Sequence, residues 1–304
     1  MRDTFAAELL TLARADERIM FVTGDLGFGV FEEFIASCPQ QYLNVGVAEQ
    51  NMIAVSSGLA REGRIVFAYS IGNFPVLRCL EQIRNDAAYH GANVKIVSIG
   101  GGFSYGPLGM SHHATEDIAI MRALPEVTTV VPGTRFEVTQ SVRGLVATEG
   151  TGFLRLDKSA GSEPTGEVPF EFGAWRVMSD GPDLTLVAAG GILGEAQEAA
   201  RLLRDDGVSA RVVSAHLLAP VERDMVIGAL GDNTTVVTVE EHVVRGGLGG
   251  LVAEVIAEDL PGVRLTRMGL AGPYVSAVGT QQYLRERNGL DAASIASRAR
   301  DLVN

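Results

Sequence analysis

The sequence is poor in cysteine, in tryptophan and in net positive charge. Among 304 residues there are two Cys and one Trp, and 37 acidic residues outnumber 25 basic ones, for a formal net charge of −12. Cys38 and Cys79 form no CxxC pair, and no Cys/His group has the spacing of zinc ligands, so we expect a reduced, cytoplasmic setting and no metal ligands on this chain. The acidic balance argues against a nucleic-acid partner, because phosphates need a cationic face.

Long apolar runs are also missing. No segment is long enough to span a bilayer, and the first residues, Met-Arg-Asp-Thr-Phe, lack the basic and then apolar pattern of a secretory signal, so we expect no membrane partner. Hydrophobic residues make up 46% of the chain and glycine is abundant at 36 residues, which is typical of a globular protein with many tight turns. The length predicts two domains.

Segments rich in Val and Ile alternate with helical segments along the first half of the chain. This alternation predicts a mostly parallel sheet covered by helices on both faces. The pattern breaks over residues 160–180, which are rich in Gly, Pro and polar residues, and then resumes. We therefore predict an α/β chain with a first domain over 1–165, a linker over 166–180 and a second, similar domain over 181–304. The strands are expected at 18–23, 42–47, 65–70, 94–99, 127–131, 153–156, 184–189, 210–214, 236–239 and 263–268.

The segment Asn-Val-Gly-Val-Ala-Glu-Gln-Asn-Met, residues 44–52, is the most informative stretch. It places Glu49 at a strand-to-helix junction, where parallel sheets hold their ligands, with no cationic side chain expected beside it. A carboxylate there can exchange a proton with a ring nitrogen of a bound heterocycle. Taken alone, a helix-start glutamate facing free backbone N–H groups is the commoner interpretation. Gly46 and the small residues that follow Glu49 favour the functional one, because they let a flat ring approach closely.

Two further segments carry candidate residues. Phe74 and Arg78 are one turn apart on a helix predicted over 74–89, so they share a face and suit a planar ligand; a core Phe with a surface Arg is the plainer alternative. A Gly-rich loop over 100–109 precedes His112 and His113, which are expected to start a helix running to about residue 123. Adjacent histidines point in different directions on a helix, which argues against a two-His metal site and leaves one of them to face a substrate.

Two shorter motifs complete the candidates. Lys158 follows the last strand before the linker, where a cation can hold an anionic group, although an exposed lysine is the plainer alternative. The run Gly246-Gly-Leu-Gly-Gly250 lacks the context of a phosphate-binding loop, so it is interpreted as a tight turn into a helix over 251–258.

Together these motifs resemble the C-terminal half of the transketolase family, over nearly the whole chain. Residues 1–165 are similar to its pyrimidine-binding domain and 181–304 to its C-terminal domain. In that family the glutamate matching Glu49 contacts N1′ of the aminopyrimidine of thiamine diphosphate, which helps the thiazolium C2 to lose its proton. The resemblance implies a catalytic pair, Glu49 and His112. It implies that the cofactor is bound by Asp25, Glu49, Phe74 and Arg78, and the sugar substrate by His112 and Lys158.

The family's Gly-Asp-Gly motif with its downstream Asn, which binds the diphosphate and a divalent metal, is missing. The resemblance therefore implies the smaller subunit of a split transketolase, with a larger subunit that holds the diphosphate and Mg²⁺ or Ca²⁺, in an α2β2 heterotetramer. Leu108 and Gly100 depart from residues that read the sugar in transketolases, which leaves the substrate open. A β subunit of a 2-oxo acid dehydrogenase decarboxylase and a non-catalytic partner subunit are the alternatives.

Overall fold

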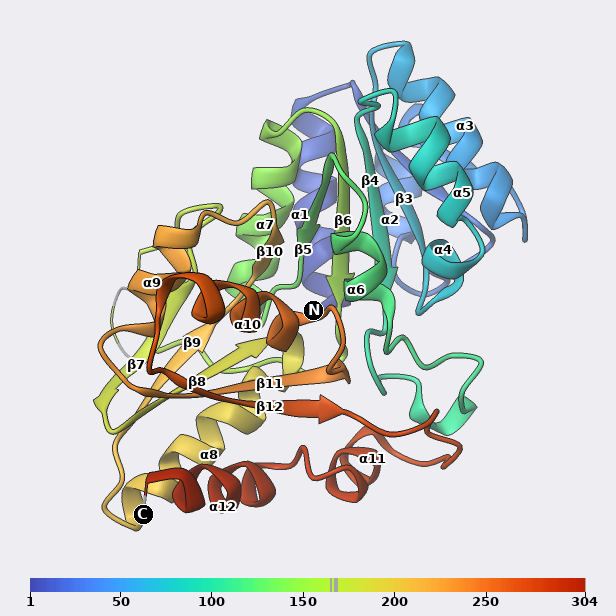
Figure 1. Cartoon of the computed structure of the whole chain (residues 1–304). Helices are drawn as coiled ribbons and strands as arrows, with labels where there is room; N and C mark the ends of the chain where they lie inside the picture. Colours follow the sequence, from blue (N-terminus) through green and yellow to red (C-terminus); the bar gives the residue numbers. More distant parts are fainter. Residues whose placement is uncertain (165, 167–168, 304) are drawn as a thin grey trace.

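The chain has two α/β domains, each built on one sheet (Figure 1). The computed structural model describes residues 1–164, 166 and 169–303. Strands of the first sheet point their C-terminal ends toward the second domain (Figure 1). The predicted fold class, two mostly parallel sheets with helices on both faces, is confirmed.

The first sheet has seven strands in the order β10-β5-β6-β4-β3-β1-β2. All neighbours pair in parallel except β10, which pairs antiparallel with β5 at one edge. Its buried strands are rich in Val, Ile and Phe, as expected when both faces are covered. The strands are β1 (Ile19–Thr23), β2 (Tyr42–Asn44), β3 (Ile65–Ile71), β4 (Val94–Ile99), β5 (Val127–Val130), β6 (Thr151–Leu156) and β10 (Leu217–Ala219).

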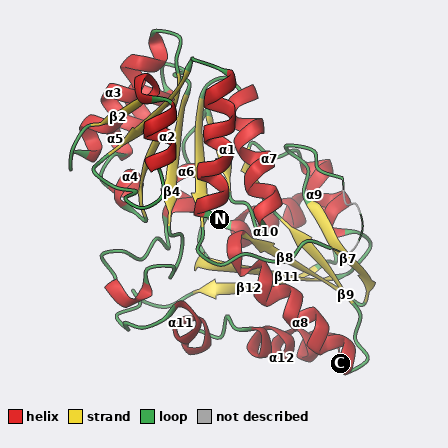
Figure 2. Ribbon diagram, turned by 180° about the vertical axis from the view of Figure 1, so that it is seen from behind, coloured by secondary structure: helices red, strands yellow, loops and turns green. Residues whose placement is uncertain are grey.

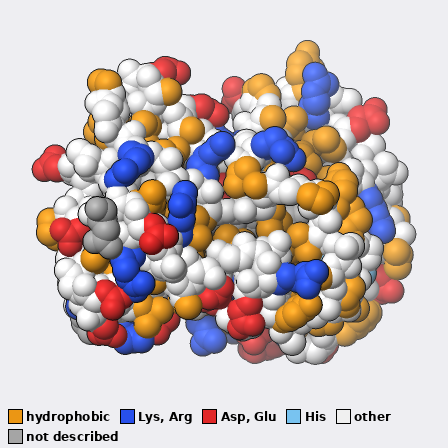
Figure 3. All heavy atoms as spheres, turned by 60° about the horizontal axis from the view of Figure 1, so that its bottom comes forward, with side chains coloured by type: hydrophobic (Ala, Val, Ile, Leu, Met, Phe, Trp, Pro, Cys, Tyr) orange, Lys and Arg blue, Asp and Glu red, His pale blue; other side chains and the backbone are white. Residues whose placement is uncertain are grey.

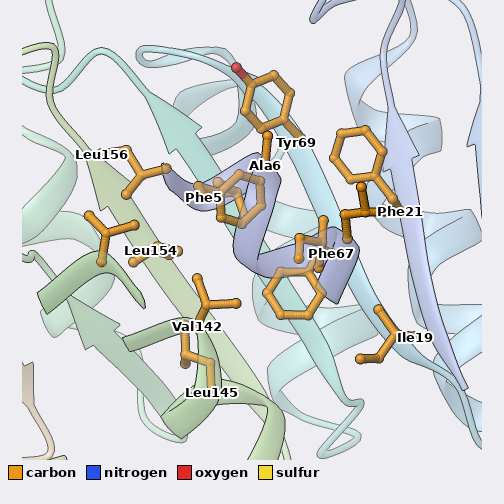
Figure 4. Packing of buried hydrophobic residues seen from close by; sticks show 14 of the residues in the cluster. Phe5, Ala6, Ile19, Phe21, Phe67, Tyr69, Val142, Leu145, Leu154 and Leu156 are labelled. Carbon is orange, nitrogen blue, oxygen red and sulfur yellow. The ribbon is translucent and has the colours of Figure 1, made fainter. Parts of the chain in front are cut away.

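Helices cover both faces of this sheet (Figure 2). One face packs against α1 (Arg2–Ala15), α2 (Glu32–Ser37) and α7 (Arg135–Ala147). Figure 4 shows side chains of α1 and α7 directed at every second residue of β1, β3 and β6, the spacing that puts side chains on one face of a strand. The other face packs against helical segments that follow β2, β3 and β4: α3 (Glu49–Arg61), α4 (Phe74–Leu77), the π-helix η2 (Ile83–Ala88) and α6 (Asp117–Arg122). The short helix α5 (Leu80–Gln82) lies between α4 and η2 in the chain.

The second sheet has five strands in the order β12-β11-β8-β9-β7, with only β7 antiparallel. Its strands are β7 (Arg176–Pro182), β8 (Leu184–Ala189), β9 (Ala210–Ser214), β11 (Thr235–Val243) and β12 (Arg264–Leu270). One face carries α8 (Leu193–Asp205), α11 (Gln281–Arg287) and α12 (Ala292–Val303), and the other carries α9 (Arg223–Leu230) and α10 (Leu248–Asp259).

Several boundaries differ from the predictions. Residues 176–180 of the predicted linker belong to β7 of the second sheet. The helix predicted over 74–89 is broken into α4, α5 and η2, because Cys79 leaves the helical region, with φ −110° and ψ 10°. The helix α10 starts at Leu248, three residues before the predicted start, because the Glu240 carboxylate accepts hydrogen bonds from the first N–H groups of the helix.

The two domains share a packed junction. The strand β10 lies after the second-domain strand β9 in the sequence, but it pairs with β5 of the first sheet. Ile118 and Val131 of the first domain are buried in a core cluster with β8, β9, α9 and α10, and Phe103 is buried in the cluster beneath α8 and α12. The second domain therefore supports the segments that follow β4 and β5.

Candidate active site

Glu49 lies at the start of α3, just after the parallel strand β2. Gly46, with φ +76°, turns the chain between them, and Glu49 is 7% exposed. The expectation that no cation lies beside it is wrong, because Arg78 Nη1 donates a hydrogen bond to Glu49 Oε1 at 3.0 Å. Spacing in the sequence does not show this contact, since Arg78 comes from the segment after β3. The pair joins a buried carboxylate to an arginine whose side chain is 52% exposed.

Phe74 and Arg78 share one side of their segment, as predicted. The Arg78 guanidinium carbon lies 4.2 Å from the centre of the half-buried Phe74 ring. The ring of His112 meets Phe74 edge to face, with 5.1 Å between the ring centres. The loop after β3 and the loop after β4 therefore meet at this aromatic contact.

His112 lies in a turn and His113 in irregular backbone, so the prediction that they start a helix is wrong. The helix α6 begins later, at Asp117. The Ser111 hydroxyl lies 3.0 Å from His112 Nδ1, so it partners the imidazole. The two imidazoles diverge, because His113 is buried against Phe103, with 5.1 Å between ring centres. Of the two, His112 is the one on the side of Phe74.

Tyr105 links His112 to Lys158. Its ring centre lies 6.4 Å from that of His112 and 3.7 Å from Lys158 Nζ. Tyr105 was not among the predicted site residues, although an aromatic residue inside a Gly-rich loop is a usable signal. Gly100, with φ +101°, is the position against which this ring packs, because a Cβ there would lie 2.2 Å from Tyr105 Cε2. Gly100 and Tyr105 are thus one structural unit.

Asp25 stands slightly apart from the other predicted residues. It follows β1 and is exposed, with φ +62°, a conformation that non-glycine residues rarely adopt. Asn44 holds it by two hydrogen bonds, since Asn44 Nδ2 donates to Asp25 Oδ1 at 3.0 Å and Asp25 N–H donates to Asn44 Oδ1 at 2.9 Å. The neighbouring Gly24 lies beside Glu49, because a Cβ at Gly24 would be 3.9 Å from Glu49 Cγ. The backbone next to Asp25 therefore lies beside Glu49, whereas the Asp25 carboxylate is held by Asn44.

A continuous row of side chains results at the C-terminal edge of the first sheet. Each member contacts or faces the next, although they come from the segments after β2, β3, β4 and β6. The order is Glu49, Arg78, Phe74, His112, Tyr105 and Lys158. A buried carboxylate, an aromatic face, an imidazole and a cation in one row can bind a flat heterocycle at one end and an anionic substrate at the other.

Charges elsewhere on the surface are mixed. On the face in Figure 3, Lys and Arg side chains lie singly among acidic and apolar ones. Within residues 1–164, 166 and 169–303, no group of three or more His, Cys, Asp or Glu is placed to hold a metal ion. No helix in the same residues has the length and apolar character needed to cross a membrane.

Fold and site together define an α/β chain with an acidic junction, which is Glu49 between β2 and α3, at the C-terminal edge of a mostly parallel sheet. Residues 1–163 match the family model "Transketolase, pyrimidine binding domain" and residues 173–295 match "Transketolase, C-terminal domain". The chain belongs to the transketolase family. The predicted membership is confirmed, and a ketol-transferring enzyme is favoured over the 2-oxo acid dehydrogenase alternative.

Several similar proteins span nearly the same length as this chain. An apulose-4-phosphate transketolase subunit of Phocaeicola vulgatus is 35% identical over 99% of this chain and 97% of its own. The 6-deoxy-6-sulfo-D-fructose transketolase subunit SqwH of a Clostridium species is 33% identical over 100% of this chain and 94% of its own. A solved structure described as "Split gene transketolase, inactive beta4 tetramer" is 33% identical, with a TM-score of 0.86, and covers 99% of this chain and 97% of its own.

Proposed function

We propose that this chain is the smaller subunit of a split, thiamine-diphosphate-dependent transketolase, which transfers a two-carbon ketol unit from a ketose to an aldehyde acceptor. The observation that carries the proposal is the continuous row from Glu49 to Lys158 on one edge of a pyrimidine-binding domain. The row has a buried carboxylate for a ring nitrogen, an aromatic face for a flat ring and a cation for an anionic sugar. These features fit the cofactor and a sugar substrate.

Each residue has a role in this proposal. Glu49 exchanges a proton with N1′ of the aminopyrimidine, and its burial keeps water away from that proton. Phe74 stacks on the same ring, and Arg78 orients both Phe74 and Glu49. His112 hydrogen-bonds the sugar, and Asp25 lies at the cofactor edge. When bound, the cofactor supplies the thiazolium carbon that carries the ketol unit.

A partner subunit completes the site in this proposal. Large apolar side chains are exposed at the edge that carries the row, which favours cover by another chain; they are Phe28, Val47, Leu77, Leu108 and Met110. The larger subunit binds the diphosphate with Mg²⁺ or Ca²⁺, and the assembly is an α2β2 heterotetramer in the cytoplasm. Relatives named as subunits support this arrangement.

Reconstitution tests the proposal. The chain is assayed alone and with its larger subunit, with thiamine diphosphate and Mg²⁺, on phosphorylated, sulfonated and unmodified ketoses and on 2-oxo acids. We expect ketose cleavage only from the pair, and no tight cofactor binding by the chain alone in isothermal calorimetry. Tight binding by the chain alone would refute the split site. Decarboxylation of 2-oxo acids without ketose cleavage would overturn the assignment to ketol transfer.

Lys158 is the residue proposed for the anionic end of the sugar. Two relatives are named for sugars that carry a phosphate or a sulfo group. Lys158→Met in the assembled enzyme is expected to raise KM for an anionic ketose by roughly 10- to 100-fold, because a charge-assisted hydrogen bond contributes about 1.5–3 kcal/mol. KM for the uncharged analogue should stay within about twofold. Arg61→Met, an exposed cation at the far end of α3, is the control. Equal losses on both sugars would contradict the role.

A further inference from the structure

The loop over residues 100–116, between β4 and α6, carries Tyr105 and His112, and the second domain contacts it closely. We propose that Glu241, on β11, is a positioning residue that holds this substrate loop in place from the second domain. The inference rests on the proposed function, because it takes the loop to be the part of the site that faces the sugar.

Glu241 is 2% exposed, and both of its carboxylate oxygens have partners. Oε1 accepts the backbone N–H of Phe103 and the side-chain amide of Gln281, the latter at 2.9 Å. Oε2 accepts a hydrogen bond from Arg285 Nε. Gly102 lies flush against the same carboxylate, because a Cβ at Gly102 would be 2.4 Å from Glu241 Oε1. The loop backbone is therefore shaped to receive this side chain.

The contact extends from Glu241 to the proposed substrate residues. Gln281 Nε2 also lies 3.4 Å from Ser104 Oγ, and the same hydroxyl accepts the backbone N–H of Lys158 at 3.3 Å. Ser104 immediately precedes Tyr105, whose ring lies between Lys158 and His112. A shift of the carboxylate would thus move the segment that carries Tyr105 and the backbone of Lys158 together.

The far end of the loop is tied to the same part of β11. Arg155 Nη2 donates to the carbonyl oxygens of Ala114, at 3.2 Å, and of Glu241, at 3.1 Å. Val243 N–H donates to Thr115 O at 2.8 Å. Residues on either side of His112 therefore take their position from the end of one second-domain strand.

Glu240 provides a matched control on the same strand. It is also buried, but its carboxylate accepts the N–H groups of Leu248 and Gly249 at the start of α10 and makes no hydrogen bond to the described residues of the loop. Successive strand residues point to opposite faces, so the two glutamates support different parts of the molecule. Replacing each by Gln separates loop positioning from general loss of stability.

The test is hydrogen–deuterium exchange of the full chain, followed by kinetics of the assembled enzyme. Glu241→Gln is expected to speed exchange in peptides over 100–116 by at least about tenfold and to leave peptides of α1 and α7 unchanged. In the assembly it should raise KM for the ketose about tenfold, with thiamine diphosphate affinity within about twofold. Glu240→Gln, with a comparable fall in Tm, should change neither loop exchange nor KM.

Gln281→Ala is the second variant, because it removes the amide that bridges Glu241 to Ser104 of the loop without unpairing a buried charge. It should reproduce the loop effect in weaker form and settles the proposal if Glu241→Gln does not fold. Unchanged exchange over 100–116 in the folded variant, or an equal change with Glu240→Gln, would overturn it. The exchange experiment needs no turnover. If the unaltered assembly did not transfer a ketol unit, its kinetics would show this and would contradict the proposed function. The exchange result for residues 100–116 would still show whether Glu241 positions the loop.

Discussion

Glu49→Gln in the assembled enzyme is expected to lower kcat by at least about 100-fold. Glutamine keeps the size of the side chain and can still hydrogen-bond, but it cannot exchange a proton with N1′, and proton transfer by a positioned group is worth roughly 10²- to 10⁴-fold. The hydrogen bond from Arg78 can be kept by the amide oxygen, so folding should survive. Steady-state ketol transfer measures the loss, and size-exclusion chromatography checks the assembly.

Glu62→Gln is the matched control for this experiment. Glu62 is an exposed residue at the end of α3, the helix that Glu49 begins, so it reports any general effect of removing a carboxylate. Its turnover should equal that of the unaltered enzyme. Near-normal turnover of an assembled Glu49→Gln enzyme would end the proposed catalytic role.

Arg155→Met is expected to cost about 3–5 kcal/mol in the free energy of unfolding at pH 7.5. Arg155 is fully buried at the domain junction, where its Nε donates to Asp117 Oδ2 at 2.9 Å and Nη1 lies 3.7 Å from Asp157 Oδ1. Removing the cation leaves two buried carboxylates without their partner, which is far more costly than loss of an exposed pair. Urea denaturation followed by circular dichroism measures the change.

The cost should shrink at lower pH, because Asp117 can then take up a proton. Burial raises the pKa of Asp117 to about 6 even beside Arg155, above its ordinary value of 3.8, so this group destabilises the folded chain as pH rises through 6. The charge of Arg155 lowers the pKa of Asp117, so in the Arg155→Met variant this carboxyl takes up a proton more readily. The difference in the free energy of unfolding between the variant and the unaltered chain should therefore be smaller at pH 5 than at pH 7.5.

Arg201→Met makes the same substitution at an exposed position. Arg201 pairs with Glu198 and Asp205 on the exposed surface of α8, so its loss should lower the stability far less than the loss of Arg155, at either pH. An Arg155→Met variant no less stable than this control would show that the buried pairs do not stabilise the junction.

Features that follow from a local sequence pattern were predictable. Glu49 is recognisable because a strand, a glycine turn and a small-residue helix follow one another in the sequence, and the contact of Phe74 with Arg78 follows from their spacing. The linker boundary was misplaced because β7 is an edge strand with a polar, glycine-containing sequence, which is typical of loops.

Contacts between distant segments were not predictable in the same way. The salt bridge of Arg78 with Glu49, the position of Tyr105 against Gly100 and the partners of Glu241 join residues on different strands or domains, or within a loop of irregular shape. None has a fixed spacing in the sequence, because it depends on which strands are neighbours in the sheet and on how the loops fold over its edge.

The sequence by itself determined the class of fold, the position of the acidic junction and the family resemblance, because alternating buried strands and helices and the segment 44–52 are local patterns. Only the tertiary structure decided that Glu49, Phe74, His112 and Lys158 form one row with Arg78 and Tyr105 between them. It also decided that the second domain contacts the loop of that row. The physical reason is that parallel pairing gathers the C-terminal ends of separate strands at one edge, where side chains far apart in the chain come into contact.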